Sequence, residues 1–558
     1  MKNKSIKKYL IRKSSTVKNA MRIIEDGQDR IGFLVDKNEN LMKAISDGDV
    51  RRFLLDGNSI DSAINEIHDR EPIILKEGYS NKDLRIAFEN SVNVVPVISK
   101  DKKIVDLIKR EELSNLYNVR SKQIGIVGLG YVGLTLGLVL ADKGFNVIGY
   151  DISSKLIKKL RKKEPPFFEN GIDVYLKNHI GKKLRITDKA NSLDADIYIV
   201  SVGTPIDKKT LLPDKRALIS SIELLANKLK INDLIIMRST LPIKSTRNLI
   251  VPKIETLSGL NCGKDFFISV CPERTIEGNA LNELTMLPQI VGGFNYKSSE
   301  LSISFFNEIS HTVVDVGSLE AAEISKLIDN SYRDYRFAFS NSMSMLSEEL
   351  NLDYNDIVQK VNLGYERNDI PLPSPGVGGP CLSKDPYILS NAFTENGLDS
   401  KFLLNARTIN ESAPKNITNR LINFLLDNKK DIINCKICII GFAFKGNPET
   451  SDLRDSTTLW LLEELKKNGF VNIYGFDPVV NKEELEEIGV KPTSIEDGFQ
   501  NADIVLIMNN HISYNKLNIL KLLKTMNKPA LFYDSWSMFS GILHNNLPNK
   551  IVYAGVGR

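Results

Sequence analysis

The 558-residue sequence is poor in cysteine and in histidine, with five of each. So few cysteines in so long a chain exclude a disulfide framework, and the histidines show no HExxH-type spacing that would predict a metal site. Cys435 and Cys438 form one CxxC pair, but the surrounding NCKICIIGFAF is typical of a buried strand, and no second pair completes a zinc site. Both cysteines are therefore predicted to be structural.

Long apolar runs and blocks of one charge are also missing. No run of about 18 or more apolar residues occurs, so no membrane-spanning helix and no membrane partner are expected. The basic N-terminus, MKNKSIKKYLIRKSS, lacks the apolar core of a secretion signal, so a cytoplasmic location is expected. The net charge of +5 is spread over many Lys-rich segments without interleaved aromatics, so nucleic acid is not an expected partner.

What is present is an ordinary globular composition, 42% hydrophobic and 26% charged, in a chain long enough for three or four domains. Residues 1–118 contain a repeat of about 63 residues, IGFLVDKNENLMKAIS (31–46) and VVPVISKDKKIVDLIK (94–109). Each copy is a β-rich run, a polar turn and a short strand after a helical segment. Such repeats are typical of two supersecondary units packed as a pair.

This repeat resembles a tandem CBS domain, an α+β module. The resemblance implies that Ser46 and Asp49, in ISDGDVRRFL, hold the phosphate and ribose of an adenine nucleotide. The second copy, DLIKREEL, lacks both residues, so at most one nucleotide site is expected. A packing or oligomerisation module without a ligand is the alternative.

From residue 122 onward, apolar strands alternate with amphipathic helices, which predicts parallel α/β sheets. We expect a dinucleotide-binding domain over 119–315, a central helical domain over 316–420 and a second α/β domain over 421–558. A stretch without Gly or Pro predicts one long helix from about Leu319 to Leu350. The predicted fold class is thus α/β, with two doubly wound domains joined by a long central helix.

The stretch QIGIVGLGYVGLTLGLVLADKGFNVIGYDI (123–152) predicts the cofactor site. Gly128, Gly130 and Gly133 lie between an apolar strand and an apolar helix, and Asp151 ends the next strand about 20 residues on. The glycines let the backbone turn tightly and approach a pyrophosphate at the helix N-terminus. Because the Asp151 carboxylate would accept hydrogen bonds from ribose hydroxyls and repel a 2′-phosphate, the sequence predicts NAD.

Six further motifs, in this order, resemble the UDP-glucose/GDP-mannose dehydrogenases over about residues 122–558. They are VGTP (202–205), RSTLP (238–242), CPERTIEGNAL (271–281), AEISKLIDNSYRD (322–334), GVGGPCLSKD (376–385) and GFAFKGNPETSDLRDS (441–456). The resemblance implies two NAD-dependent oxidations of a nucleotide-sugar primary alcohol to a carboxylate. It also implies a homo-oligomer, at least a dimer paired through the long helix.

The resemblance implies that Cys381 is the nucleophile of a covalent step. An aldehyde gives up a second hydride only after a nucleophile has added to its carbon, and a thiolate that adds yields a thiohemiacetal and then a thioester. Gly376, Gly378 and Gly379 are expected to keep bulk away so that a sugar carbon can approach.

Three residues of the predicted long helix face one way: Lys326, Asn330 four residues on, and Arg333 three further. The resemblance places Lys326 and Asn330 beside the reacting oxygen.

The resemblance implies the other site residues as well. Glu273 activates the hydrolytic water, Glu277 aligns the site with Thr204, and Asp385 holds Lys326 and a water. Lys384 reaches a cofactor phosphate or faces solvent. The implied cofactor residues are Tyr131, Val132, Lys155, Thr204, Ser239, Thr240, Glu277, Lys384 and Arg454. The implied substrate residues are Glu273, Arg274, Lys326, Asn330, Arg333, Arg367, Gly378, Phe444 and Lys445.

Two features bear on the sugar. Arg274 in PERTIEG and Arg333 in NSYRD resemble the branch that acts on UDP-N-acetylhexosamines, whereas Pro380 stands where that branch commonly has histidine. We expect UDP-N-acetylglucosamine or UDP-N-acetylmannosamine as the substrate, with UDP-glucose as the alternative. Other classes left open are a single-hydride β-hydroxyacid dehydrogenase and an inactive nucleotide sensor.

Overall fold

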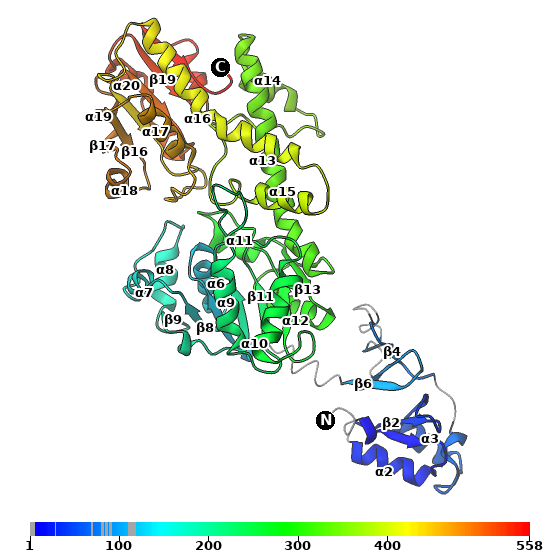
Figure 1. The fold of residues 1–558 in the computed structure, drawn as a ribbon. Coiled ribbons are helices and arrows are strands. Elements are labelled where there is room, and N and C mark those ends of the chain that lie inside the picture. Colours follow the sequence, from blue (N-terminus) through cyan, green and yellow to red (C-terminus); the bar gives the residue numbers. More distant parts are fainter. Residues whose placement is uncertain are drawn as a thin grey trace. The chain divides into compact units, whose positions relative to one another are not determined.

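The computed structural model describes residues 6–27, 29–67, 71–79, 83, 87–88, 92–109 and 119–558. They form two compact units, Met1–Arg120 and Ser121–Arg558 (Figure 1). The expected boundary at residue 118 and part of DLIKREEL lie at 110–118, outside the described residues.

The N-terminal unit contains two three-stranded sheets of the same design. In each, the first two strands are parallel and the last two are antiparallel, with a register shift at Leu34/Val35 in one sheet and at Val97/Ile98 in the other. Tyr9, Phe33 and Val94 form a buried cluster that joins the sheets. The elements are β1 (Leu10–Arg12), α2 (Val17–Gly27), β2 (Ile31–Val35), β3 (Leu41–Ser46), α3 (Asp47–Leu55), β4 (Leu75–Lys76), β5 (Val94–Ile98) and β6 (Ile104–Lys109).

The larger unit begins with an eight-stranded sheet in the order β14-β13-β12-β11-β10-β7-β8-β9. Strands β7 to β12 follow the dinucleotide-binding order, which reverses between β7 and β10. These strands are apolar and buried, as expected for a sheet covered on both faces. The strands are β7 (Gln123–Val127), β8 (Asn146–Tyr150), β9 (Leu184–Thr187), β10 (Ile197–Val200), β11 (Leu234–Met237), β12 (Phe267–Val270), β13 (Gln289–Gly293) and β14 (Val313–Asp315). The helices are α6 (Tyr131–Asp142), α7 (Ser154–Arg161), α8 (Ile172–His179), α9 (Arg216–Ala226), α10 (Val251–Ser258), α11 (Ala280–Met286) and α12 (Tyr296–Asn307).

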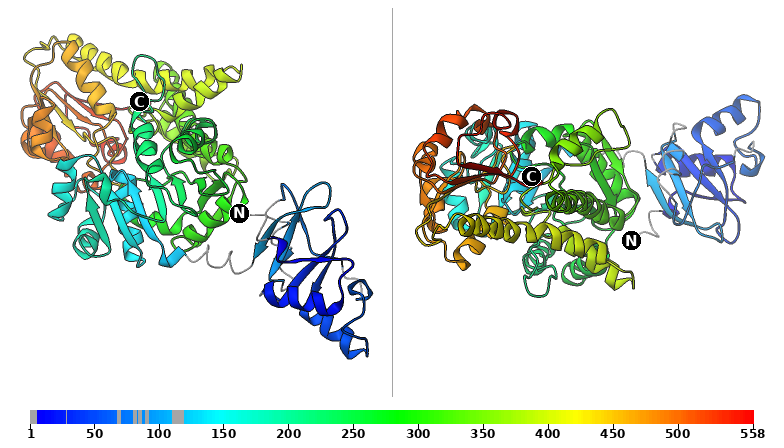
Figure 2. Two further views of the ribbon diagram at one scale, coloured as in Figure 1. Left: turned by 60° about the horizontal axis from the view of Figure 1, so that its bottom comes forward. Right: turned by 90° about the horizontal axis from the view of Figure 1, so that it is seen from above.

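The expected long helix is α13 (Leu319–Glu349), and Ser318 caps its first turn by accepting from the Ala321 N–H. It packs against α15 (Asp385–Glu395) and α16 (Lys401–Asp427), and α14 (Tyr354–Asn362) follows it. Figure 2 shows α16, in yellow, running from these helices to the C-terminal sheet. Because α16 is continuous through residue 420, the central and C-terminal parts share one helix across the expected boundary.

The C-terminal sheet has six parallel strands in the order β17-β16-β15-β18-β19-β20, a second doubly wound arrangement that reverses between β15 and β18. Cys438 lies in β15, and burial raises the pKa of both Cys435 and Cys438 to about 12. The strands are β15 (Ile437–Ile440), β16 (Ile473–Phe476), β17 (Lys491–Pro492), β18 (Ile504–Ile507), β19 (Ala530–Asp534) and β20 (Ile551–Ala554). The helices are α17 (Thr457–Lys467), α18 (Lys482–Glu487), α19 (Ile495–Phe499), α20 (Ile519–Lys524) and α21 (Ser540–Leu543).

Candidate active site

The glycine-rich turn after β7 lies where the strand order of the first sheet reverses. Gly128 adopts a left-handed φ of 93°, and a Cβ at Gly133 would lie 1.9 Å from the Gly128 carbonyl oxygen, so this glycine permits close packing. Gly130 precedes α6 without a capping side chain, and a Cβ there would meet nothing within 4 Å. The turn therefore leaves an open approach to unpaired helix N–H groups, which fits a pyrophosphate.

Asp151 follows β8 beside this turn. Its carboxylate accepts from the Leu129 N–H and the Ser153 N–H, each at 2.8 Å. A carboxylate fixed in this way keeps lone pairs for ribose hydroxyls. The other predicted cofactor residues near this turn differ in exposure. Lys155 is exposed on α7, and Val132 is half-buried. The Tyr131 hydroxyl donates to Glu169.

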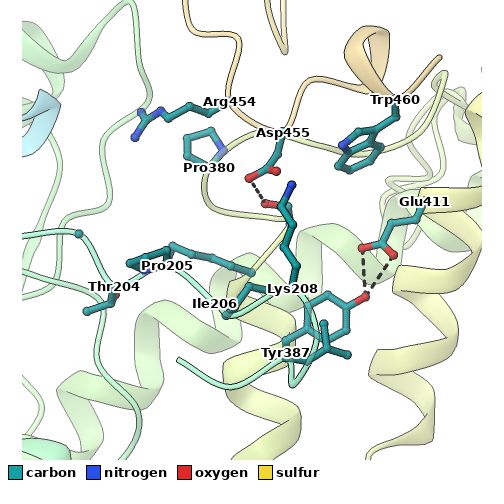
Figure 3. A pocket seen from close by; sticks show the side chains of 14 residues that line it. Thr204, Pro205, Ile206, Lys208, Pro380, Tyr387, Glu411, Arg454, Asp455 and Trp460 are labelled. Atoms are coloured by element: carbon teal, nitrogen blue, oxygen red, sulfur yellow. Dashed lines mark hydrogen bonds between the residues drawn. The ribbon is translucent and has the colours of Figure 1, made fainter. Parts of the chain in front are cut away.

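Three of the predicted residues, Thr204, Lys384 and Arg454, meet in a cavity of about 810 Å³. Figure 3 shows Thr204 and Arg454 on the side of the cavity away from Trp460 and Glu411. Thr204 donates to the Thr240 carbonyl oxygen at 2.7 Å, and Ser239, also buried, donates to the Val202 carbonyl oxygen at 2.7 Å. The cavity is lined by Gly203, Thr204, Pro205, Ile206, Lys208, Leu211, Pro380, Ser383, Lys384, Tyr387, Glu411, Arg454, Asp455 and Trp460.

Cys381 is exposed on the loop before α15. Burial lowers the pKa of Lys384, but Asp385, and after it Cys381, outweigh burial and raise it. Cys381 is also the last of the groups that oppose the effect of burial on the pKa of Arg454, after Asp452 and Glu277, and on that of Lys445, which burial lowers to about 8. Lys384 on the Cys381 loop, and Lys445 and Arg454 on the segment after β15, therefore all interact with the predicted nucleophile.

The structure gives the glycines before Cys381 another role than the one expected. A Cβ at Gly378 would lie 2.0 Å from the Asp455 carbonyl oxygen, and one at Gly379 would lie 2.5 Å from the Phe444 ring. At Gly376, which has a φ of 98°, it would lie 2.6 Å from the Asn410 carbonyl oxygen. Protein atoms fill this space, so these glycines let the loop pack against α16 and the C-terminal segment.

Lys326 and Asn330 project from α13 into a second cavity of about 400 Å³, which Glu273, Arg274 and Arg333 also line. Asn330 donates to Asp385 at 2.5 Å and accepts from Arg333 at 2.5 Å. The other oxygen of Asp385, which is fully buried, pairs with Lys384 at 2.5 Å. Asp385 therefore holds Lys384 and Asn330 in this structure rather than Lys326, because the Lys384 ammonium is adjacent and desolvated.

Glu273 forms a buried ion pair with Arg238, whose Nη2 lies 2.7 Å and Nε 3.1 Å from Glu273 Oε2. Oε1 accepts from the backbone N–H groups of Arg274 and Thr275. Burial raises the pKa of Glu273, but the charge of Arg238, these donors and the charge of Lys326 outweigh it and hold the pKa below its ordinary value. Glu273 is therefore an ionised, firmly oriented carboxylate at the wall of the second cavity.

Glu277 connects the first α/β sheet to the segment after β15. Its carboxylate lies 3.3 Å from Arg454 Nη2, and its carbonyl oxygen accepts from Lys445 Nζ at 2.5 Å. Burial, followed by the charge of Asp452, raises the pKa of Glu277 to about 7, although Arg454 and Lys445 oppose the shift. Both predicted phosphate-binding cations thus contact Glu277.

Three predicted substrate residues have other contacts. Arg274, at the wall of the second cavity, pairs with Asp329 at 2.9 Å, and Phe444, beneath the Lys445 ammonium, packs on Gly379. Arg367 is exposed, stacks on Tyr365 and lines neither cavity.

In the N-terminal unit, Ser46 and Asp49 cap α3 reciprocally. Asp49 accepts from the Ser46 N–H at 2.9 Å and from its hydroxyl at 2.6 Å, and Ser46 accepts from the Asp49 N–H at 3.2 Å. The capping box satisfies both side chains locally. Nucleotide binding there stays a prediction.

The sequence did not single out several residues that organise the site. Buried Glu169 accepts from the N–H groups of Gly278 and Leu281 and so fixes the loop that carries Glu277. Arg407 is fully buried between α13 and α16, donates to Asp334 at 2.6 Å and contacts the Val377 carbonyl oxygen at 3.2 Å. Arg238 lies within the RSTLP motif, which was the only sequence signal for any of these three.

Comparisons with known proteins follow the same division of the chain. Residues 122–310 match the NAD binding domain of the UDP-glucose/GDP-mannose dehydrogenase family, residues 320–412 its central domain and residues 438–541 its UDP binding domain. These matches lie within the Ser121–Arg558 unit. They favour a nucleotide-sugar dehydrogenase over a single-hydride β-hydroxyacid dehydrogenase.

Among curated relatives, the UDP-N-acetyl-D-mannosamine dehydrogenase of Methanococcus aeolicus is 31% identical over 395 residues, 70% of this chain and 85% of the relative. The protein of the same name from Pyrococcus horikoshii is 29% identical over 439 residues, 78% of this chain and 99% of the relative. A solved structure of UDP-D-ManNAc dehydrogenase from Pyrococcus horikoshii has a TM-score of 0.70 and 28% identity, covering 78% of this chain and 99% of its own. The expected fold class, NAD as cofactor and dehydrogenase activity are confirmed.

Within the described ranges, no helix is both long and apolar enough to span a membrane. No group of three or more His, Cys, Asp or Glu side chains in the same ranges is arranged to hold a metal ion.

Proposed function

Because the chain belongs to the UDP-glucose/GDP-mannose dehydrogenase family, we propose that it oxidises carbon six of a UDP-N-acetylhexosamine to the carboxylate. The observation that carries the proposal is exposed Cys381 on the loop whose Lys384 lines a cavity together with Thr204 and Arg454. The names of the relatives favour the mannosamine sugar over the glucosamine one.

The balanced reaction takes one primary alcohol, two NAD⁺ and one water to one carboxylate, two NADH and three protons. The first oxidation gives the aldehyde. The Cys381 S–H then adds across the C=O bond, so that a C–S bond forms and the oxygen gains the proton. Loss of the second hydride and that proton gives the thioester, and water cleaves its C–S bond and returns the thiol.

Residues of this chain have separate roles in these steps. Lys326 and Asn330, at the wall of the second cavity, stabilise the negative charge that develops on the reacting oxygen. Glu273 accepts a proton from the hydrolytic water, and its low pKa keeps it ionised, as a general base must be, although it makes the base weaker. Lys445 and Arg454 bind phosphate groups, and Glu277 holds both at the site.

NADH formation across a panel of UDP-sugars tests the substrate. We expect a preference for UDP-N-acetylmannosamine and two NADH per sugar. A clear preference for UDP-glucose contradicts the hexosamine assignment, and one NADH per sugar contradicts the four-electron reaction.

Cys381→Ser tests the covalent step. We expect the four-electron rate to fall far more than about ten-fold and NADH per sugar to fall from two toward one. Cys262→Ser is the matched control, because burial raises the pKa of Cys262 to about 12 and makes it a poor nucleophile. A Cys381→Ser enzyme with the wild-type rate removes the covalent mechanism.

We also propose that a second copy of the chain packs on α13. Its exposed apolar side chains include Ile328, Tyr332, Tyr335, Phe339 and Leu346. Their spacing of three, four and seven residues places them along one face of the helix, and contiguous exposed apolar surface marks an interaction site. Sedimentation should give at least a dimer, which Tyr335→Glu with Phe339→Glu should dissociate. A monomeric wild type contradicts this proposal.

For the N-terminal unit, we propose regulation by an adenine nucleotide near Ser46 and Asp49. The support is the internal repeat with its two matching sheets. Calorimetry with AMP, ADP and ATP tests it, and Asp49→Ala should abolish any heat that is seen. No heat with all three nucleotides favours a packing module.

A further inference from the structure

Asp455, on the segment between β15 and α17, forms hydrogen bonds with the loop that carries Cys381. The Gly379 N–H donates to the Asp455 carbonyl oxygen at 2.9 Å, and the Ser383 hydroxyl donates to Asp455 Oδ2 at 3.2 Å. These contacts fall two residues before and two residues after Cys381. The single Ser383 hydroxyl proton is shared between Asp455 and the Gly379 carbonyl oxygen, which is nearer at 2.7 Å, so Asp455 contacts the loop on both sides of the cysteine.

The backbone of Asp455 packs directly against the backbone of this loop. A Cβ at Gly378 would lie 2.0 Å from the Asp455 carbonyl oxygen, so the two backbones are in direct contact. Close-packed backbones transmit a displacement rather than absorb it. A shift of Asp455 therefore moves residues 378–383 with it.

Asp455 has a left-handed backbone conformation. Its φ of 50° lies in the region that aspartate and asparagine adopt more readily than other residues except glycine, and local contacts hold it there. Arg454 pairs with Asp452 at 2.5 Å, and Ser456 caps α17 while its hydroxyl donates to the Phe442 carbonyl oxygen at 2.7 Å. Asp455 thus has a fixed geometry at the wall of the first cavity.

We propose that Asp455 is a positioning residue that holds Cys381 in register with the segment carrying Lys445 and Arg454. The proposal rests on the covalent function of Cys381 described above. Its consequence differs between the two oxidations. The first oxidation, of the alcohol, needs no sulfur, whereas the second follows addition of the thiol to the aldehyde carbon. Misplacement of Cys381 therefore slows the second step selectively.

Asp455→Gly removes the carboxylate but keeps the backbone conformation, because glycine accepts a φ of 50° without strain. We expect the four-electron rate to fall about ten-fold or more, since small misplacements of reacting groups cost large factors. NADH per sugar should fall from two toward one, with the released aldehyde trapped by hydroxylamine. The rate of Cys381 alkylation by iodoacetamide, without substrate, should change several-fold.

Two further variants of this contact sharpen the test. Asp455→Asn keeps an acceptor for Ser383 and tolerates the left-handed backbone, so it should restore most of the rate and the ratio of two NADH per sugar. Ser383→Ala removes this bond together with the Ser383 bond to Gly379, and it should move the NADH ratio in the same direction as Asp455→Gly. If Asp455→Gly does not fold, Asp455→Ala with Asp455→Asn as its rescue replaces it.

The matched control for glycine at a left-handed position is Asn501→Gly. Asn501 has a φ of 57° and is exposed in the turn before β18, so its replacement should alter melting temperature alone. Asp455→Gly and Ser383→Ala enzymes that both keep two NADH per sugar and the wild-type alkylation rate overturn the proposal. If Cys381→Ser keeps two NADH per sugar, the covalent function fails instead, and the alkylation rates still report whether Asp455 fixes the loop.

Discussion

Replacing Glu273 by alanine would leave the Arg238 guanidinium buried without a counter-charge. The Arg238 side chain is 0% exposed and that of Glu273 is 5% exposed, and two guanidinium nitrogens contact one carboxylate oxygen. Removing one partner of such a pair costs about 3–5 kcal/mol, because the other charge stays desolvated. The unfolding entropy of a unit of several hundred residues is about 1 kcal/mol/K, so the Tm at pH 7 should fall by about 3–5 °C.

The Tm difference between wild type and Glu273→Ala should also depend on pH in a defined direction. Arg238 holds the folded pKa of Glu273 below the ordinary 4.5, so the stabilisation is fully present above pH 4.5 and is lost as the pH falls through the folded pKa. The Tm gap between wild type and Glu273→Ala, measured by calorimetry, should therefore narrow only in acid. Arg238→Met combined with Glu273→Leu should recover most of the lost stability without activity. A gap under about 1 °C at pH 7 would refute the reasoning.

Two other predictions concern Glu277 and the cofactor turn. Because burial raises the folded pKa of Glu277 to about 7, the folded chain binds more protons than the unfolded chain between pH 4.5 and 7. Wild type should thus lose on the order of 3 kcal/mol relative to Glu277→Gln as pH rises from 5 to 8, and a difference that calorimetry finds flat contradicts this. Gly130→Ala should weaken NAD binding, measured by titration, without changing Tm, since its Cβ meets no protein atom. Gly133→Ala should lower Tm, because its Cβ lies 1.9 Å from a backbone oxygen, and equal Tm values for the two variants would contradict the assignment.

Local patterns predicted the parts of the fold that depend on nearby residues. The glycine turn with Asp151 and the long helix α13 are where the sequence placed them, because each is set by periodicity and by glycines within about 30 residues. Lys326, Asn330 and Arg333 do lie on one face of α13, as their spacing required. The grouping of Thr204 with Lys384 and Arg454 agrees with the cofactor residues that the family resemblance implied.

Contacts between distant segments were not predictable in this way. The spacing of Gly376, Gly378 and Gly379 says that side chains are excluded there, but not that Asp455 and Phe444 fill the space. Likewise, Asp385 pairs with Lys384 and not with Lys326 because the tertiary fold buries the Lys384 ammonium beside it, and the sequence alone does not show this. The continuity of α16 through residue 420 depends on its packing against both α13 and α17.

The environment of Cys381 is assembled from two halves of the dehydrogenase unit. Lys384 precedes α15, whereas Lys445 and Arg454 come from the segment after β15. Interactions between exposed charges are largely screened beyond about 8 Å at physiological salt, so Lys445 and Arg454 act on Cys381 only while the C-terminal sheet stays docked. The contact between Asp455 and Gly378 keeps it docked at one point, and Glu277 with Arg454 does so at another. The covalent step is therefore tied to the same contacts that hold the nucleotide-binding segment in place, and a thiol released from them loses two of its three cations together.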